Sequence, residues 1–286
     1  MANPYTITEV KKLIHKHNLH PKKRFGQNFL VDQNILNKIV GSCQLTKQDY
    51  VVEIGPGFGA LTQKLAEHSK KVIAIDVDTS LDPVLKEVLK NYDNVNIIYQ
   101  DILNINLENE ITKQLNLQEV QPYKICANIP YNISTPILFT LLENCPNMTS
   151  ATLMMQKEVA FRLIAKPGTK DYGLLTIMAA YHSNIDHVMN VSKNCFYPKP
   201  EVESTVIRIT PDTNKKKIVK NEIQFKKFVK TAFQKRRKTI LNICASHFKV
   251  EKSVIIEKLQ NEGIKPESRP ENLTLEDFAL VTDLFY

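Results

Sequence analysis

The chain has 286 residues, is 43% hydrophobic and 24% charged, and carries a formal net charge of +8, as expected for a soluble globular protein with one large and one small domain. It has no run of about 18 apolar residues that could cross a membrane, and Met1 to Asn18 lacks the apolar core of a signal peptide. The five cysteines form no CxxC pair and the seven histidines no HExxH motif, so we expect no disulfide framework, no metal site and a cytoplasmic location.

Short β-branched runs alternate with helical patterns over the first two hundred residues. This alternation is typical of a parallel sheet with crossover helices, and a later pair of strands is expected to be antiparallel. The predicted strands are 50–54, 71–75, 95–99, 123–127 and 152–156, followed by 185–191 and 204–209. The predicted helices are 33–43, 60–68, 84–91, 135–143 and 172–181.

A linker is predicted at Pro211–Asn214, which is followed by three lysines. Beyond it, apolar residues from Phe225 to Cys244 recur at helical spacing. We therefore predict an α/β domain over residues 1–210 and a small helical domain over residues 215–286.

The positive charge is concentrated in this second domain. Residues Lys215 to Lys252 contain 13 lysines and arginines against two acids, and a smaller cluster lies at Lys22–Arg24. Concentrated positive charge attracts a phosphate backbone through counterion release. A lysine-rich solvated helix face is the alternative, but the local excess favours binding to nucleic acid.

Residues Val51–Ala60 combine a strand, a glycine-rich turn and the start of a helix. Gly55 and Gly57 let the backbone approach a ligand closely. The next strand ends at Asp76, where an acid can hold ribose hydroxyls, and the third leads to Asp101, which could accept a hydrogen bond from an adenine amine. Because open α/β sheets bind ligands at the carboxyl ends of their strands, this pattern predicts a nucleoside cofactor site.

The same glycine pattern also fits the loose G-x-G-x-x-A of an NAD-linked dehydrogenase, and such a pattern alone is weak. Two acids favour S-adenosylmethionine (SAM) instead: Glu53 precedes the first glycine by two residues, and Asp101 is a second adenosine-type acid. No Tyr-Lys or His-centred group for hydride transfer stands out. Asp76 or Asp101 taken alone could equally be a helix cap or a turn acid.

The segment Asn128-Ile129-Pro130-Tyr131 directly follows a predicted strand. An exocyclic amine on a nucleobase is a poor nucleophile, because its lone pair is delocalised into the ring, so a site must accept its hydrogens and hold the base. Asn128 offers a carbonyl acceptor, Pro130 favours an extended residue before it, and Tyr131 offers a stacking face. By itself the tetrapeptide could equally be an ordinary strand-to-helix turn.

The chain resembles the KsgA-type small-subunit ribosomal RNA adenine dimethyltransferases along nearly its whole length. Four motifs carry the resemblance in the right order and spacing: Arg24–Leu30 (RFGQNFL), Glu53–Gly57 (EIGPG), Asn128–Tyr131 (NIPY) and Phe196–Pro200 (FYPKP). The resemblance implies a Rossmann-like SAM-dependent methyltransferase domain, with a mostly parallel sheet and an antiparallel end, plus a small α-helical C-terminal domain.

The resemblance also implies roles for individual residues. The residues expected to contact SAM are Asn28, Leu30, Gly55, Asp76, Asp101 and Asn128. Asn128 and Pro130 would present acceptors to the target amine, and Tyr131 and Phe196 would sandwich the flipped adenine. No metal is required, because SAM is itself a strong electrophile.

The implied reaction transfers methyl groups to two adjacent adenines in a hairpin loop near the 3′ end of 16S rRNA, with a 30S precursor as partner and a monomeric enzyme. Two positions depart from the family pattern: Asp76 stands where Glu is commoner, and Ile129 where Leu is usual. Isoleucine there is typical of the Erm enzymes, which methylate 23S rRNA and confer macrolide resistance. Tyr172–Thr176 and the basic Phe233–Thr239 favour the small-subunit enzyme; an Erm-type enzyme and a non-catalytic RNA-binding assembly factor remain the alternatives.

Overall fold

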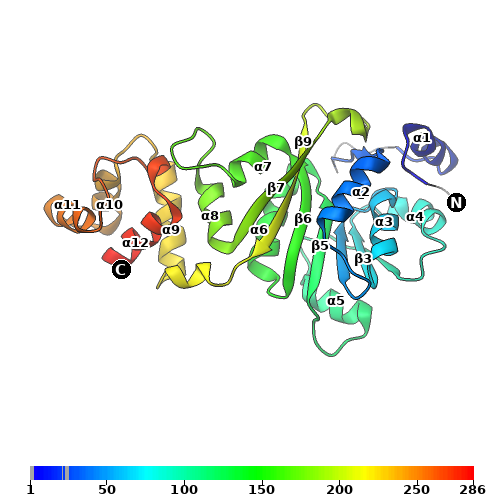
Figure 1. Cartoon of the computed structure of the whole chain (residues 1–286), viewed down its shortest axis with the longest axis horizontal. Coiled ribbons are helices and arrows are strands. Elements are labelled where there is room, and N and C mark those ends of the chain that lie inside the picture. The colour runs from blue at the N-terminus through cyan, green and yellow to red at the C-terminus, as the bar shows by residue number, and fades with distance from the viewer. Residues whose placement is uncertain (1–2, 21, 23–25) are drawn as a thin grey trace. The chain divides into compact units, whose positions relative to one another are not determined.

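The computed structural model describes residues 3–20, 22 and 26–286 (Figure 1). The chain divides into two compact units, each with a hydrophobic core of its own. The first unit contains Met1–Ala160 and Asp186–Pro211, and the second contains Phe161–Ile185 and Asp212–Tyr286.

A seven-stranded sheet in the order β4-β3-β2-β5-β6-β9-β7 forms the centre of the first unit. Strands β4, β3, β2, β5 and β6 are parallel, and β9 runs antiparallel to β6, which confirms the predicted mostly parallel sheet with an antiparallel end. The strands are β2 (Tyr50–Ile54), β3 (Lys71–Asp76), β4 (Val95–Tyr99), β5 (Tyr123–Asn128), β6 (Met148–Gln156), β7 (Ser183–Val191) and β9 (Ser204–Pro211).

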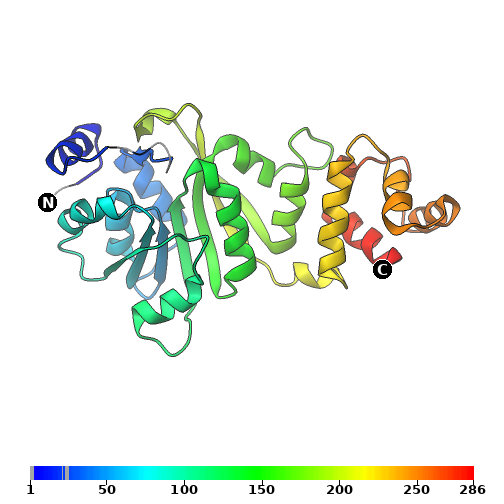
Figure 2. The ribbon, with the colours of Figure 1, turned by 180° about the vertical axis from the view of Figure 1, so that it is seen from behind.

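Helices cover both faces of this sheet: α2 and α3 lie in front of it in Figure 1, and α6 lies in front when the molecule is turned round in Figure 2. This cover explains why β2 and its neighbours are nearly continuous apolar runs, since both of their faces are buried. The helices are α1 (Ile7–Lys16), α2 (Gln33–Ser42), α3 (Ala60–His68), α4 (Asp82–Val88), α5 (Leu107–Leu115), α6 (Ser134–Asn144) and α7 (Lys157–Leu163), the last of which crosses into the second unit.

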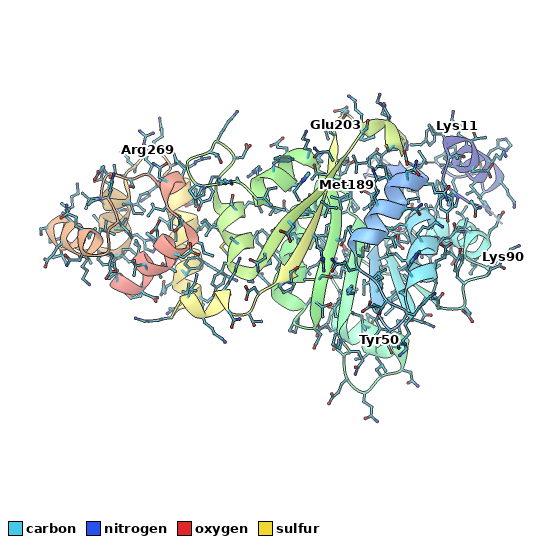
Figure 3. The ribbon with its side chains drawn as sticks, viewed as in Figure 1. Lys11, Tyr50, Lys90, Met189, Glu203 and Arg269 are labelled. Atoms are coloured by element: carbon cyan, nitrogen blue, oxygen red, sulfur yellow. The ribbon has the colours of Figure 1, made fainter. Side chains whose placement is uncertain are left out.

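The carboxyl ends of the parallel strands share one edge of the sheet. Tyr50, labelled in Figure 3, begins β2 at the opposite edge, whereas Glu203, just before the antiparallel β9, lies on the same side as the carboxyl ends. A separate antiparallel pair, β1 (Phe29–Leu30) with β8 (Phe196–Tyr197), brings the N-terminal segment to the loop before β9. The sequence pattern did not predict this pair, because two-residue strands have no periodicity.

The second unit is helical. Its helices are α8 (Leu174–His182), α9 (Glu222–Gln234), α10 (Ile240–Phe248), α11 (Lys252–Asn261) and α12 (Leu275–Phe285). Phe225, Phe228 and Phe278 are fully buried in its core, and rings from α9, α10 and α12 pack together there. Side chains cap the N-termini of α9 and α12: Asn221 accepts from the Gln224 N–H, and Thr274 forms a capping box with Asp277.

Residues 161–185 belong to the helical unit, although the sequence pattern assigns them to the α/β domain of 1–210. Tyr172, Ile177 and Tyr181 are buried in the core of the second unit, and the Tyr172 hydroxyl donates to the Leu273 carbonyl over 2.6 Å. Helix α8 is apolar on nearly every side, so its sequence resembles a crossover helix over a sheet. Only its tertiary packing assigns it to the helical core.

Within the ranges the structure describes, no helix has both the length and the hydropathy needed to span a membrane.

Candidate cofactor and amine site

A cavity of about 740 Å³ lies at the carboxyl edge of four neighbouring parallel strands of the first unit. One polar side chain follows or ends each strand in spatial order: Asp101 after β4, Asp76 on β3, Glu53 on β2 and Asn128 on β5. All four line the cavity. The sequence separates them by as many as 75 residues; the strand order places them in one row.

The glycine-rich turn between β2 and α3 forms the floor of this row. Gly55 and Gly57 have φ values of +72° and +56°, a region that residues with a Cβ rarely adopt. A Cβ at Gly57 would lie 2.9 Å from the Phe29 ring, and one at Gly55 would lie 3.8 Å from the Asn128 carbonyl oxygen. The glycines therefore allow close approach of the turn to both the N-terminal segment and the end of β5.

Asp76 and Asp101 are held by the backbone of their own turns. The Asp76 carboxylate accepts from the Asp78 N–H over 2.9 Å, and Asp101 accepts from the Leu103 N–H over 3.0 Å and from the Asn104 amide over 2.8 Å. Burial raises the pKa of Asp76, although the backbone donors act against that rise. Both carboxylates are preorganised as acceptors at the edge of the cavity.

Glu53 is the most deeply buried acid of the row, with a relative exposure of 1%. Burial raises its pKa to about 8, and the negative charge of Asp76 adds to that rise, while the Thr62 hydroxyl acts against it. None of the described groups forms a hydrogen bond with Glu53 Oε2. A buried carboxyl oxygen without a partner inside a cavity indicates a ligand that would supply one.

The N-terminal segment forms the opposite wall. Its Asn28 backbone carbonyl accepts from the Asn128 side-chain amide over 3.0 Å, and the Phe29 ring packs on Phe58 with centroids 4.2 Å apart. Gln27 donates to Asp78 over 2.8 Å and anchors this segment to the turn after β3. Of the basic cluster expected here, Lys22 forms an ion pair with Asp78 at 2.6 Å; Lys23 and Arg24, as well as Phe25 of the opening motif, lie outside the described residues.

The Asn128–Tyr131 turn presents its groups toward the same cavity. The Ile129 N–H donates to the Met154 carbonyl over 3.0 Å and its side chain is buried, so the turn is fixed to β6. The Pro130 carbonyl accepts from the Ile133 N–H over 3.2 Å. The Tyr131 hydroxyl lies 2.6 Å from the Ser204 hydroxyl, which fixes the tyrosine ring at the cavity wall.

Two predicted site residues differ in their access to the cavity. Phe196 does not line it: the ring is 2% exposed and belongs to the core cluster that contains Leu30, its partner in the β1–β8 pair. Tyr131 therefore offers an accessible ring in this conformation, whereas the Phe196 ring is covered. Of the two aromatic residues that the sequence motifs suggest, Tyr131 lines the cavity and Phe196 does not.

Several cavity residues were not identified as site residues from sequence. Val77 is 45% exposed and follows Asp76, and Phe29 and Phe58 pack against the glycine turn. The sequence signal for Val77 as a cavity residue is its position as an apolar residue directly after a strand-end acid. The sequence shows Glu53 only as an acid before the glycines, and the lack of a hydrogen-bond partner for its Oε2 atom among the described residues is evident only in the fold.

The charge of the cavity identifies the type of cofactor it suits. Three carboxyl groups line it, and no Lys, Arg or His occurs among its described lining residues, although the protein is basic overall. No basic side chain is therefore present in the described lining to neutralise a dinucleotide pyrophosphate, whereas carboxyl groups suit a cationic sulfonium compound. The donor set and the unpartnered Glu53 oxygen therefore fit SAM. Throughout the ranges described, no cluster of three or more His, Cys, Asp or Glu side chains could hold a metal ion.

The helical unit carries the predicted basic segment. Lys235, Arg237 and Lys238 are exposed in the turn between α9 and α10. Arg236 differs from them, because its guanidinium donates to the Tyr172 carbonyl over 3.2 Å and lies 3.7 Å from the Glu271 carboxylate. Arg236 is therefore partly structural, while its neighbours project from the surface.

Known proteins similar to this chain share its fold and match it over nearly its whole length. The family model "Ribosomal RNA adenine dimethylase" matches residues 18–285. The ribosomal RNA small subunit methyltransferases A of Anoxybacillus flavithermus and Alkaliphilus oremlandii are 42% and 41% identical, over 98% and 96% of this chain and 96% and 95% of their own lengths.

Solved structures show the same architecture. A dimethyladenosine transferase from Plasmodium falciparum superposes with a TM-score of 0.74 and 27% identity, covering 87% of this chain and 94% of its own. The 23S rRNA methyltransferase ErmE, at 23% identity, has a TM-score of 0.70 over 90% of this chain and 99% of its own, which shows a common fold. Because the family model covers almost the whole chain and the curated relatives match over nearly their full lengths, the chain belongs to the ribosomal RNA adenine dimethylase family.

Proposed function

We propose that this enzyme transfers methyl groups from SAM to the exocyclic amines of two adjacent adenines in a hairpin loop near the 3′ end of 16S rRNA, giving dimethyladenosine during small-subunit biogenesis. The observation that carries this proposal is the row of Asp101, Asp76, Glu53 and Asn128 along one cavity. The row joins an adenosine-type site to an amide acceptor and the Tyr131 ring.

SAM, when bound, supplies an electrophilic methyl group, so the protein has only to position the amine and accept its hydrogens. The Asn128 side chain uses its NH₂ group on the Asn28 carbonyl, which leaves Oδ1 as the acceptor for the target amine. Among the described groups, none donates to the Ile129 carbonyl, whereas the Pro130 carbonyl already accepts from Ile133. We assign the second acceptor to Ile129 and a shaping role to Pro130.

These two acceptors would stabilise the positive charge that develops on the amine nitrogen as it attacks. They would also favour a tetrahedral nitrogen whose lone pair points at the methyl group. As the bond from nitrogen to the methyl carbon forms, the bond from sulfur to that carbon would break and its electron pair would stay on the thioether sulfur. The methylated nitrogen then carries a positive charge and is acidic, so its proton can leave to solvent without a strong base. The once-methylated amine must then turn and react again. That rotation is possible because hydrogen bonds alone, and no covalent or metal bond, would hold the amine in the site.

The Tyr131 ring would hold the extruded adenine by stacking, with Ser204 fixing its orientation. For Phe196 to stack on the other face of the adenine, its covered ring must become exposed when the RNA loop enters. The β1–β8 pair, which joins Phe196 to Leu30, is the element whose movement would expose it.

The relatives named for the small subunit are far more similar to this chain than the 23S rRNA enzyme, and this supports small-subunit RNA as the substrate. The helical unit would bind phosphates through exposed basic residues such as Lys235, Arg237 and Lys238. Loop bases are already partly unstacked, which lowers the free-energy cost of extruding the adenine. We also propose that the enzyme acts in the cytoplasm, as a monomer, on a 30S precursor.

The deciding experiment is methyl transfer from labelled SAM to purified small subunits that lack the modification, with isolated 23S rRNA as the competing substrate. We expect label in dimethyladenosine of 16S rRNA. Label in 23S rRNA instead would indicate an Erm-type enzyme. Binding to small subunits without transfer would indicate an assembly factor that has lost its chemistry.

A further inference from the structure

The Glu53 carboxyl group has no role in the methyl transfer proposed above, although its burial is electrostatically unfavourable. It is 1% exposed, lines the cavity, and its Oε2 atom has no hydrogen-bond partner among the described residues. An ionised carboxylate in such a place is strongly unfavourable unless a cation or a donor set compensates it. Glu53 is therefore either protonated or ionised and paired with a cationic ligand.

The strand order places Glu53 at a defined point along the cofactor. If Asp101 and Asp76 take the adenine and ribose, the next position in the row is Glu53 on β2, followed by Asn128 on β5. Gly55, two residues after Glu53, lies close to the Asn128 carbonyl. Glu53 thus lies between the nucleoside end and the place of methyl transfer, where the sulfonium end of an extended SAM molecule belongs.

The groups that face Glu53 from neighbouring elements do not neutralise it. Asp76 on β3 is a second acid, the Cys126 thiol lies opposite Glu53 in the β2–β5 register, and α3 contributes the Thr62 hydroxyl. The described cavity lining contains no basic side chain. Burial first, and then the charge of Asp76, raises the pKa of Glu53 to about 8, so the carboxyl group is mainly protonated near neutral pH before the cofactor binds.

We propose that Glu53 is the counter-charge for the positive sulfonium end of SAM: it releases its carboxyl proton to solvent when SAM binds, and it thereby distinguishes cationic SAM from the neutral thioether product, S-adenosylhomocysteine (SAH). This inference rests on the SAM-dependent function proposed above. After transfer the sulfur is neutral, and Glu53 takes a proton back from solvent. The absence of a cationic partner then weakens the binding of the product and favours its release.

The test is calorimetric titration of the full-length protein with SAM and with SAH, near neutral pH, in two buffers of different ionisation enthalpy. In the unmodified protein we expect SAM binding to release close to one proton and SAH binding to release markedly less. Glu53→Gln keeps the size and the neutral hydrogen-bonding character of the protonated acid. It should abolish the proton release and reduce the preference for SAM over SAH by about tenfold.

Asp101→Asn is the matched control, because Asp101 lies in the same row but at the adenine end. It should weaken SAM and SAH alike, and leave the proton count and the SAM preference unchanged. Proton release that persists in Glu53→Gln, or an equal loss of affinity for both ligands, would overturn the role of Glu53. If neither ligand binds the unmodified protein, the cofactor assignment itself fails, which is a different result.

Thermal unfolding of Glu53→Gln shows whether the variant is folded. If it is not, the unmodified protein still decides the question through pH. Its affinity for SAM should increase as the pH rises through the neutral range, as Glu53 ionises more readily, while its affinity for SAH should change little. Parallel pH profiles for the two ligands would contradict the proposal.

Discussion

The Asn128 side-chain amide donates a hydrogen bond of 3.0 Å to the backbone carbonyl of Asn28, a residue one hundred positions earlier in the chain. A carbonyl can only accept, so this hydrogen bond determines that the NH₂ group faces Asn28 and that Oδ1 faces away from it. The N-terminal segment therefore sets the orientation of the proposed catalytic amide. It does so without its Asn28 side chain, which instead donates to the Gly26 carbonyl over 3.1 Å.

Removal of the Asn128 amide should abolish transfer. We expect Asn128→Ala to lower methyl transfer to small subunits by about 100-fold or more, while SAM affinity falls only modestly, because the acceptor acts mainly on the attacking amine. Asn128→Asp keeps acceptors but loses the donor to Asn28 and adds a negative charge, so it should also be severely impaired. Near-normal turnover in either variant would contradict the assigned role.

The hydrogen bond between Tyr131 and Ser204 should matter less than the tyrosine ring. Tyr131→Phe and Ser204→Ala each remove a hydrogen bond worth about 1 kcal/mol, so each should lower turnover by roughly fivefold. Tyr131→Ala removes the stacking face, worth about 1–3 kcal/mol, and should reduce turnover further. Single-turnover rates of the two mild variants and of their double mutant should show that the effects do not add, since both remove the same bond.

A methyl group at Gly57 should disturb the cofactor site specifically. In Gly57→Ala the new Cβ would meet the Phe29 ring at 2.9 Å, and φ is +56°, a conformation that costs about 1–2 kcal/mol in a residue with a side chain. We expect SAM affinity to fall at least about tenfold with the fold retained, measured by titration and by circular dichroism. Gly41→Ala, where an added Cβ meets nothing within 4 Å, is the matched control and should bind SAM normally.

Glu53 should make the stability of the cofactor-free protein fall with pH in a defined window. Its folded-state pKa is raised to about 8 from an ordinary value of 4.5, so the folded protein binds more protons than the unfolded chain between these values. The contribution is fully present below 4.5 and is lost as the pH rises through 8, with a slope of at most about 1.4 kcal/mol per pH unit. Denaturant unfolding across this range should show the decline in the unmodified protein and a smaller one in Glu53→Gln.

The exposed basic residues of the α9–α10 turn should contribute to RNA affinity in a salt-dependent way. Replacing Arg237 and Lys238 with alanine should weaken binding to small subunits and reduce the salt dependence by about one ion for each phosphate that the variant no longer binds. The matched control removes the same charge from α4 of the first unit and the turn after it, as Lys86→Ala with Lys90→Ala (Figure 3 labels Lys90). Equal effects of the two double variants would mean that net charge alone, and no specific surface, governs binding.

Much of the first unit could be predicted from sequence, because its signals are local. The runs Tyr50–Ile54 and Val95–Tyr99 are strands with the predicted ends, and α3 occupies the predicted Ala60–His68, since β-branched runs and a glycine turn before a helix need no distant partner. Helices α1 and α5 were not predicted, because each is mostly polar and buries only two residues, so its apolar face is narrow. The assignment of 161–185 required the packing of Tyr172 and Tyr181, which no local pattern reveals.

The sequence by itself determined the chemistry that this protein contains: a glycine turn, strand-end acids, an amide-proline-tyrosine turn and a concentration of positive charge. The tertiary structure alone decided which of these groups meet. Parallel strand order brings Asp101, Asp76, Glu53 and Asn128 into one row; pairing with Leu30 covers Phe196; and the Asn28 carbonyl orients the Asn128 amide. The physical reason is that a residue type fixes what a side chain can donate, accept or bury, whereas its partner, burial and protonation depend on segments far away in the chain.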